Sequence, residues 1–347
     1  MKGKNLLGKL SLIALFAIAT QSCKKENGID NNNVIQRPYV LYASDAVGNI
    51  INSNDGENFR TIFSGDGKPL RALITSKKNI IIVKEKTVFF SENEGKVFNP
   101  IKPILVQVPS IILWPYFILD IPSLNRIYIC NERIGAVAQT AISPENGTYF
   151  NPDTSWTEND TPLIMESFTY ADNKILYGYS QTGSLFAGNK LFAKFEKDKV
   201  WTPVYTDLPN TTGARYYLSH TGSRLVATDY NAISTGAYYS DDSGKRFKPY
   251  TGLPIGKTIH CTYSAYQTLL VGTGNGVYRT SGTAFEAANS GIPANTIVYS
   301  IVAKDNLYKN DVVNKYFYIA TNKGIYKSED LAKSWVKVKD GDYRLLY

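Results

Sequence analysis

Few side chains in this sequence could perform metal or nucleophilic chemistry. The 347 residues include only two histidines and three cysteines. His220 and His260 each stand alone, with no second histidine at helical spacing and no Cys-x-x-Cys nearby, which is typical of satisfied polar residues rather than ligands. Cys130 and Cys261 lie in strand-like patterns and are expected to be buried free thiols. We therefore expect no metal site and no cofactor.

Carboxylates offer the main enzymatic alternative, which is hydrolysis of a glycosidic bond. That reaction needs two carboxyl groups about 5 to 9.5 Å apart. The candidates are Asp45, Glu132, Glu166 and Asp229, and the sequence alone does not pair them. A glycoside hydrolase therefore stays an alternative to a non-catalytic binding function.

The third cysteine, Cys23, follows a segment that is typical of export. Three lysines precede an apolar stretch over residues 10–20, which is too short to span a bilayer. Small residues then lead to Ser22-Cys23, and this order resembles a bacterial lipobox, in which the cysteine is acylated. The resemblance implies a signal peptide over residues 1–22, lipidation of Cys23 and a flexible polar tether over residues 23–38.

The residues that follow Cys23 also indicate a location. A basic start followed by an Asn-rich stretch resembles lipoproteins of the Bacteroidota, which implies an outer-membrane lipid anchor on the periplasmic side or at the cell surface. Removal of residues 1–22 lowers the formal charge from +8 to +5, a mild value that gives no reason to expect nucleic acid as a partner. The most apolar later stretch, residues 111–121, is too short to be a membrane span.

A turn of the form Ser-x-Asp-x-Gly-x-x-aromatic recurs along the chain. Its third position is occupied, in five readable copies, by Asp55, Asn93, Glu145, Asp242 and Asp330. The distance from Ser53 to Ser328 corresponds to six intervals of about 46 residues, the size of a four-stranded blade. Two copies must then be degenerate, and we expect them near residues 186–190 and 280–285.

This turn resembles the Asp-box, or BNR repeat, of β-propellers, a family that includes sialidases, sortilin-type receptors and photosystem II assembly factors. The resemblance implies an all-β fold, a seven-bladed β-propeller of four-stranded antiparallel blades over residues 39–347. The Asp and Ser side chains are expected to accept N–H groups of their own turn, so the boxes are structural. Residues 342–347 are expected to complete the first blade and close the ring. Sialidases need an arginine triad, a Tyr–Glu nucleophile pair and an Arg-Ile-Pro motif near the start, and only Arg37-Pro38 resembles that last motif here.

Ligand specificity is expected on the face opposite these turns, where the sequence varies between repeats. The residues expected to bind there are Glu132, Arg133, Trp156, Asp229 and Tyr230, together with Trp114 and Tyr116 near the central channel. Exposed aromatic residues suit contacts with a carbohydrate or a protein. The sequence therefore predicts a monomeric, non-catalytic envelope lipoprotein that binds a glycan or an envelope protein, with the identity of the ligand open.

Overall fold

The computed structural model describes residues 35–76, 79–85, 87–101, 115–121, 126–131, 140–143, 151–152, 157–158, 161–162, 167–181, 189–195, 198, 200–209, 215–230, 236–254 and 256–347. These residues form strands, turns and connections, without a helix, so the all-β prediction is confirmed. It follows that this part of the chain contains no helix able to cross a membrane. The predicted signal peptide and Cys23 lie outside the described residues.

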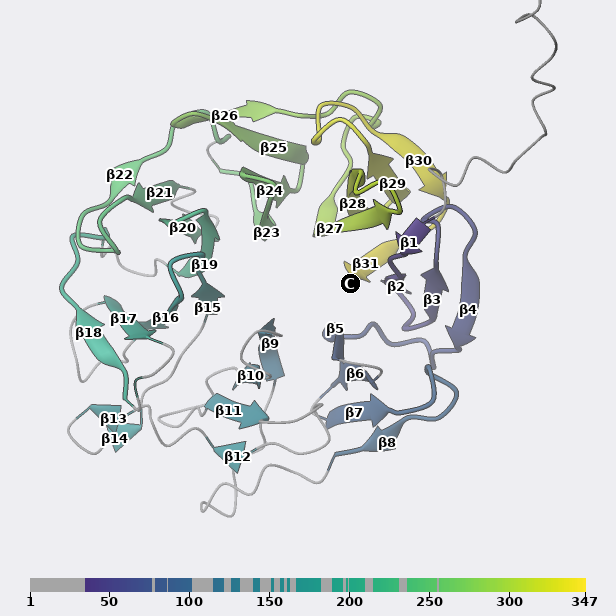
Figure 1. Ribbon diagram of the computed structural model, residues 1–347, viewed down its shortest axis with the longest axis horizontal. Coiled ribbons are helices and arrows are strands. Elements are labelled where there is room, and N and C mark those ends of the chain that lie inside the picture. Colours follow the sequence, from purple (N-terminus) through teal and green to yellow (C-terminus); the bar gives the residue numbers. More distant parts are fainter. Residues whose placement is uncertain are drawn as a thin grey trace, which may run out of the picture.

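The strands pair antiparallel in sheets that stand around a common centre (Figure 1). In the described residues there are six four-stranded sheets, one five-stranded sheet and a two-stranded hairpin. The first three sheets, each from the innermost strand outward, are β31 (Tyr343–Leu346), β2 (Leu41–Asp45), β3 (Ile50–Ser53) and β4 (Arg60–Phe63); β5 (Ala72–Ser76), β6 (Asn79–Lys84), β7 (Thr87–Ser91) and β8 (Asn99–Pro100); and β9 (Pro115–Ile121), β10 (Arg126–Asn131), β11 (Thr140–Ser143) and β12 (Asn151–Pro152).

The next three sheets repeat this order. They are β15 (Ser167–Tyr170), β16 (Ile175–Gln181), β17 (Asn189–Phe195) and β18 (Thr202–Val204); β19 (Tyr216–Thr221), β20 (Arg224–Asp229), β21 (Ala237–Ser240) and β22 (Lys248–Pro249); and β23 (Ile259–Ala265), β24 (Thr268–Thr273), β25 (Gly276–Ser281) and β26 (Ala284–Ala287). The last sheet contains β27 (Val298–Tyr308), β28 (Val313–Thr321), β29 (Gly324–Ser328) and β30 (Val336–Lys339), with β1 (Ile35–Arg37) added to β27.

The innermost strands contact one another in a complete circle. The order of contact is β31, β5, β9, β15, β19, β23, β27 and back to β31. Side chains connect neighbouring strands of this circle: the Ser167 hydroxyl donates to the Tyr216 carbonyl at 2.7 Å, and Ser300 Oγ accepts the Leu346 N–H at 3.1 Å. These bonds satisfy backbone groups on strand edges that no further strand pairs.

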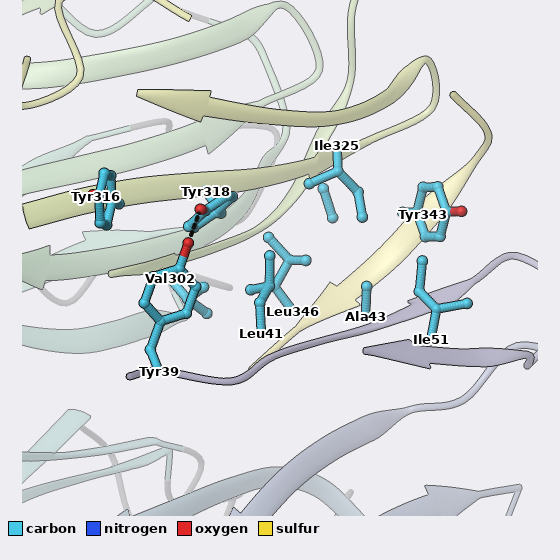
Figure 2. Packing of buried hydrophobic residues seen from close by; sticks show 11 residues of the cluster. Tyr39, Leu41, Ala43, Ile51, Val302, Tyr316, Tyr318, Ile325, Tyr343 and Leu346 are labelled. Atoms are coloured by element: carbon cyan, nitrogen blue, oxygen red, sulfur yellow. Dashed lines mark hydrogen bonds between the residues drawn. The ribbon is translucent and has the colours of Figure 1, made fainter. Parts of the chain in front are cut away.

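The C-terminal strand completes the first sheet, as predicted. Strand β31 pairs with β2, with Ala43 opposite Leu346 and Asp45 opposite Tyr343. Tyr343 and Leu346 are buried in a cluster shared by the first and last sheets (Figure 2). Segments near both ends of the described chain therefore meet in one apolar contact between the first and last sheets.

Strand β1 is a feature that the sequence did not reveal. Residues 35–37 were placed in the tether, but Ile35 pairs with Tyr308 and Arg37 with Leu307 at the far end of β27. The pairing extends the last sheet to five strands, and Ile35 lies at the side of the ring that holds the Ser-x-Asp turns.

One of the two degenerate turns was predicted at the wrong position. Residues 280–285 do form the turn between β25 and β26. The equivalent turn of the fourth sheet follows Phe195, where the Asp198 carboxylate accepts the Phe195 N–H at 3.1 Å. It does not lie near 186–190, because residues 189–190 begin the third strand of that sheet. A uniform period misses this position because the connections differ in length.

Large side chains fill the space between sheets. Trp201 and Trp335, which precede the outer strands β18 and β30, are buried, at 5% and 3% exposure. The Trp335 indole N–H donates to the Ala288 carbonyl at 2.8 Å. Each such aromatic residue removes a large apolar area from water and fixes the spacing of adjacent sheets.

Candidate functional site

The Ser-x-Asp turns use their polar groups on their own backbone. In the turn after β21, the Ser240 hydroxyl accepts the Gly244 N–H at 2.9 Å, and the Asp242 carboxylate accepts the Arg246 N–H at 2.9 Å. The turns at Asp55, Asn93 and Asp330 have the same two kinds of bond, and Glu145 lies outside the described residues. The fifth residue of the turn has a positive φ, which is 89° at Gly95, 87° at Gly244 and 64° at Ala332. In the first turn, which is one residue shorter, the equivalent residue is Gly56, with a φ of 76°. Glycine adopts this conformation without strain.

The antiparallel order of the strands sorts the connections between two faces. The side that holds the turns at Asp55, Asn93, Asp242 and Asp330 is called the Asp-turn face. The other side, called the opposite face, holds the turns after β2, β6, β20, β24 and β28 and the first residues of the innermost strands. The turn chemistry leaves few free polar groups on the Asp-turn face, so the opposite face and the channel are the better candidates for a site.

Several predicted binding residues cannot be placed. Glu132, Arg133, Trp114 and Trp156 lie outside the described residues. The connection that contains Trp156 includes a short hairpin, β13 (Thr157–Glu158) with β14 (Thr161–Pro162), which lies at the periphery of the ring in Figure 1. Tyr116 belongs to β9, whose pairing with β10 shifts register between Cys130 and Asn131, as expected beside Pro115.

The other two predicted residues have different surroundings. Asp229 is buried, at 2% exposure, and its carboxylate accepts the Arg215 N–H at 3.3 Å, a position that suits holding the turn rather than touching a ligand. Tyr230 is half-buried and stacks on Tyr217, with 4.1 Å between the ring centroids.

Three planar side chains lie at the mouth of the channel on the opposite face. They come from the first residues of three adjacent innermost strands. The Arg344 guanidinium lies 4.0 Å from the centroid of the Tyr299 ring, and the His260 ring lies 5.4 Å from the same ring at a steep angle. Burial, with a smaller contribution from Arg344, lowers the pKa of His260, so this imidazole is neutral at pH 7. We call Arg344, Tyr299 and His260 the mouth cluster.

The channel itself is a cavity of about 710 Å³. The innermost strand of every four- or five-stranded sheet contributes to its wall. Its described lining includes the cationic residues Arg71 and Lys304, two histidines and many hydroxyl groups, but no aspartate or glutamate. The cavity is therefore positive in character, and its volume falls within the range of small-molecule sites, about 300–1,000 Å³.

Lys304 lies at the end of the channel near the Asp-turn face. It also lines a second cavity of about 310 Å³, beside Arg37, Tyr42 and Thr75. Its Nζ lies 5.2 Å from the centroid of the Tyr347 ring. Burial lowers the pKa of Lys304 to about 8, although the neighbouring Asp305 opposes that shift.

His220 connects two innermost strands at the same end. Its Nδ1 lies 2.8 Å from the Thr169 hydroxyl on β15, and its Nε2 lies 3.6 Å from the Asp172 carboxylate. Burial lowers the pKa of His220 despite Asp172. The thiol of Cys261 faces the Val298 carbonyl at 4.0 Å, and burial raises its pKa to about 12. The expectation of a free Cys261 thiol is confirmed, and the high pKa makes this thiol unreactive.

The carboxylates considered for hydrolysis are engaged in turns where they are described. Asp45 accepts the N–H groups of Val47 and Asn49 at 3.0 and 2.8 Å, and Asp229 accepts the N–H of Arg215, just before β19. Glu132 and Glu166 lie outside the described residues. In the part of the chain that the structure describes, no group of three metal-ligating side chains comes together either.

Sequence reasoning missed Lys304 and the mouth cluster. Each of these residues lies in a strand pattern that looks like its neighbours. Lys304 lies inside the long strand β27, and nothing in its local sequence indicates that it lines the channel.

No protein-family model matches the chain, and no curated protein is significantly similar to it. Solved structures do resemble it. The YCF48 protein bound to a D1 peptide has a TM-score of 0.54 at 12% identity, over 83% of this chain and 89% of that protein. A 6-phosphogluconolactonase-like protein from Bacteroides uniformis has a TM-score of 0.57 at 10% identity, over 90% of this chain and 99% of that protein.

A third structure is the extracellular domain of a hybrid two-component system from B. thetaiotaomicron, with a TM-score of 0.50 at 13% identity over 77% of this chain and 33% of that one. At these identities the similarity concerns the fold alone. The neighbours are β-propeller proteins, and sheets set around a channel are the arrangement expected of that fold. The chain therefore has a β-propeller fold.

Proposed function

We propose that this chain is a seven-bladed Asp-box β-propeller that binds a glycan, without catalysis, at the channel mouth on the opposite face. The observation that carries the proposal is the mouth cluster of Arg344, Tyr299 and His260, together with the Tyr217–Tyr230 stack on the adjacent strand. Half-buried planar side chains with polar edges suit sugar rings, which combine an apolar face with hydroxyl groups. Glu132, Arg133 and Trp156 remain proposed contacts on the same face.

The location of the exposed apolar side chains favours a glycan, rather than a protein, as the ligand of the opposite face. Protein-binding surfaces on monomers usually include a contiguous apolar patch. Of the large exposed apolar residues in the described chain, only Val47 lies in a turn of the opposite face. The others lie on β1, on the hairpin after β27, in Asp turns or on outer strands and their connections.

The proposed location is the bacterial envelope, with Cys23 as a lipid anchor. The extracellular propeller neighbour from B. thetaiotaomicron supports this location. Eleven residues separate Cys23 from Ile35, and an extended chain of that length reaches about 40 Å. Because β1 enters the ring from the Asp-turn face, an anchor at Cys23 would turn that face to the membrane and leave the opposite face accessible.

A glycan array followed by titration of the best ligand tests the proposal. Tyr299→Ala should weaken binding about tenfold or more, as expected when a sugar loses an aromatic platform. Tyr205→Ala is the matched control, because Tyr205 is 93% exposed beside an outer strand and should leave affinity unchanged. The proposal is wrong if the wild type binds no glycan, or if both variants bind like the wild type.

A further inference from the structure

The charged residues that line the channel suit an acidic ligand. Among its described lining residues, Arg71 and Lys304 are cationic and none is acidic. The nearest carboxylate to Lys304 along the chain, Asp305, is paired instead with Arg37 at 3.5 Å. A lysine whose nearest carboxylate along the chain is engaged by an arginine, at one end of a partly buried channel, favours an anionic ligand because partial burial strengthens their attraction.

Lys304 has an ammonium group available for such a ligand. Its described contacts are the Tyr347 ring, at 5.2 Å from Nζ, and the electrostatic influence of Asp305. Several other described lysines have carboxylate partners, for example Lys327 with Glu329 at 2.7 Å and Lys337 with Asp340 at 3.0 Å. Lys304 therefore differs from lysines that form an ion pair with a carboxylate at the surface.

The wall of the channel also contains an unpartnered buried hydroxyl. Ser219 is 7% exposed and lines the channel, and its Oγ has no hydrogen-bond partner. A buried hydroxyl without a partner costs free energy, and a polyhydroxylated ligand would supply the missing bond.

We propose that the channel binds a small hydroxylated organic acid, such as a sugar acid, with its carboxylate on Lys304 and its hydroxyl groups against the hydroxyl-rich wall that includes Ser219. The cavity of about 710 Å³ is large enough for one such molecule. This site lies inside the ring and at the end toward the Asp-turn face, so it does not depend on glycan binding at the opposite mouth.

Titration calorimetry with D-glucuronate, D-glucose and sulfate tests the proposal. The wild type should bind glucuronate about tenfold or more tightly than glucose or sulfate, because only glucuronate offers both a carboxylate and hydroxyl groups. Lys304→Met should lose about tenfold or more in glucuronate affinity. Lys315→Met is the matched control, since Lys315 also lies over a tyrosine ring, at 5.1 Å from Tyr266, but outside the channel.

A labelling experiment on the unmodified protein covers the case in which Lys304→Met fails to fold. Pyridoxal 5′-phosphate condenses with a lysine amine to an imine and water, and borohydride reduces the imine to a stable secondary amine. Mass spectrometry should find Lys304 labelled at pH 8, with glucuronate protecting it and glucose not. The proposal is overturned if glucose or sulfate binds as tightly as glucuronate, if Lys304→Met binds like the wild type, or if glucuronate gives no protection.

Discussion

The hydroxyl groups of Tyr39 and Tyr318 connect the first and last sheets, and their removal should have unequal effects. The Tyr39 hydroxyl donates to the Asp55 carbonyl at 2.8 Å and also contacts the Tyr318 hydroxyl (Figure 2). Because Tyr39 has one proton and gives it to Asp55, Tyr318 must be the donor to Tyr39. Burial raises the pKa of Tyr39 to about 12 and that of Tyr318 further still, so both groups stay protonated.

This direction of bonding sets the size of each effect. Tyr318→Phe removes one bond and leaves Tyr39 bonded to Asp55, which should cost about 0.5–1.5 kcal/mol in the free energy of unfolding. Tyr39→Phe removes two bonds and leaves the Tyr318 hydroxyl, at 0% exposure, without a partner. That change should cost about 2–4 kcal/mol. The double variant no longer contains the orphaned hydroxyl and should be more stable than Tyr39→Phe alone.

Urea unfolding followed by tryptophan fluorescence measures these differences at 25 °C. The exposed Tyr205→Phe serves as a control and should not move the midpoint. A Tyr318→Phe variant that is as unstable as Tyr39→Phe, or two substitutions whose costs simply add, would refute the assignment of donor and acceptor at this contact.

Three further predictions concern the turns and the anchor. Asp242→Ala should lower the urea midpoint without changing ligand affinity, because its carboxylate bonds Arg246 within its own turn; loss of binding in a folded variant would move the site to the Asp-turn face. Burial opposes ionisation of Asp330, but hydrogen bonds from Ser334 and the turn outweigh it and hold its pKa at about 2, below the ordinary 3.8. The contribution of ionised Asp330 to the free energy of unfolding is present above pH 3.8 and is lost as the pH falls through 2. The free energy of unfolding of Asp330→Asn should therefore fall less steeply over this pH range than that of the wild type, and equal slopes for the two proteins would contradict this. Cys23→Ser should shift the protein from the membrane to the soluble fraction, and a wild type that is already soluble would exclude the lipid anchor.

The repeated elements of this fold could be predicted from the sequence because their signals are local. A Ser-x-Asp turn depends on bonds within seven residues, so Ser240 and Asp242 indicate the turn wherever it occurs. The pairing of residues 343–346 with β2 was predictable for a different reason: the first repeat lacked an innermost strand, and the chain ended in an unassigned strand-like segment.

Features that depend on distant segments were not predictable. Strand β1 has three exposed residues and no alternating pattern, and it pairs with the free edge of the part of β27 that extends, together with β28, beyond β29. The degenerate turn at Asp198 lacks both the serine and the glycine of the repeat. Asp229 was expected to contact a ligand, yet its carboxylate is turned into the protein by a backbone N–H that the sequence does not identify.

The channel shows why a regular repeat makes the fold easy to recognise and the site difficult. The innermost strands share similar demands, since each pairs with the second strand of its sheet and packs between two neighbouring sheets. The channel wall mixes apolar, aromatic and polar residues, and a single lysine in one strand gives no repeated pattern. The charge of the cavity arises only when segments about 46 residues apart converge and none of their described side chains at the wall is a carboxylate. The lack of acidic side chains at the wall involves many repeats and cannot be detected in any one of them. The acid site inferred at Lys304 therefore becomes visible only when the whole ring is assembled.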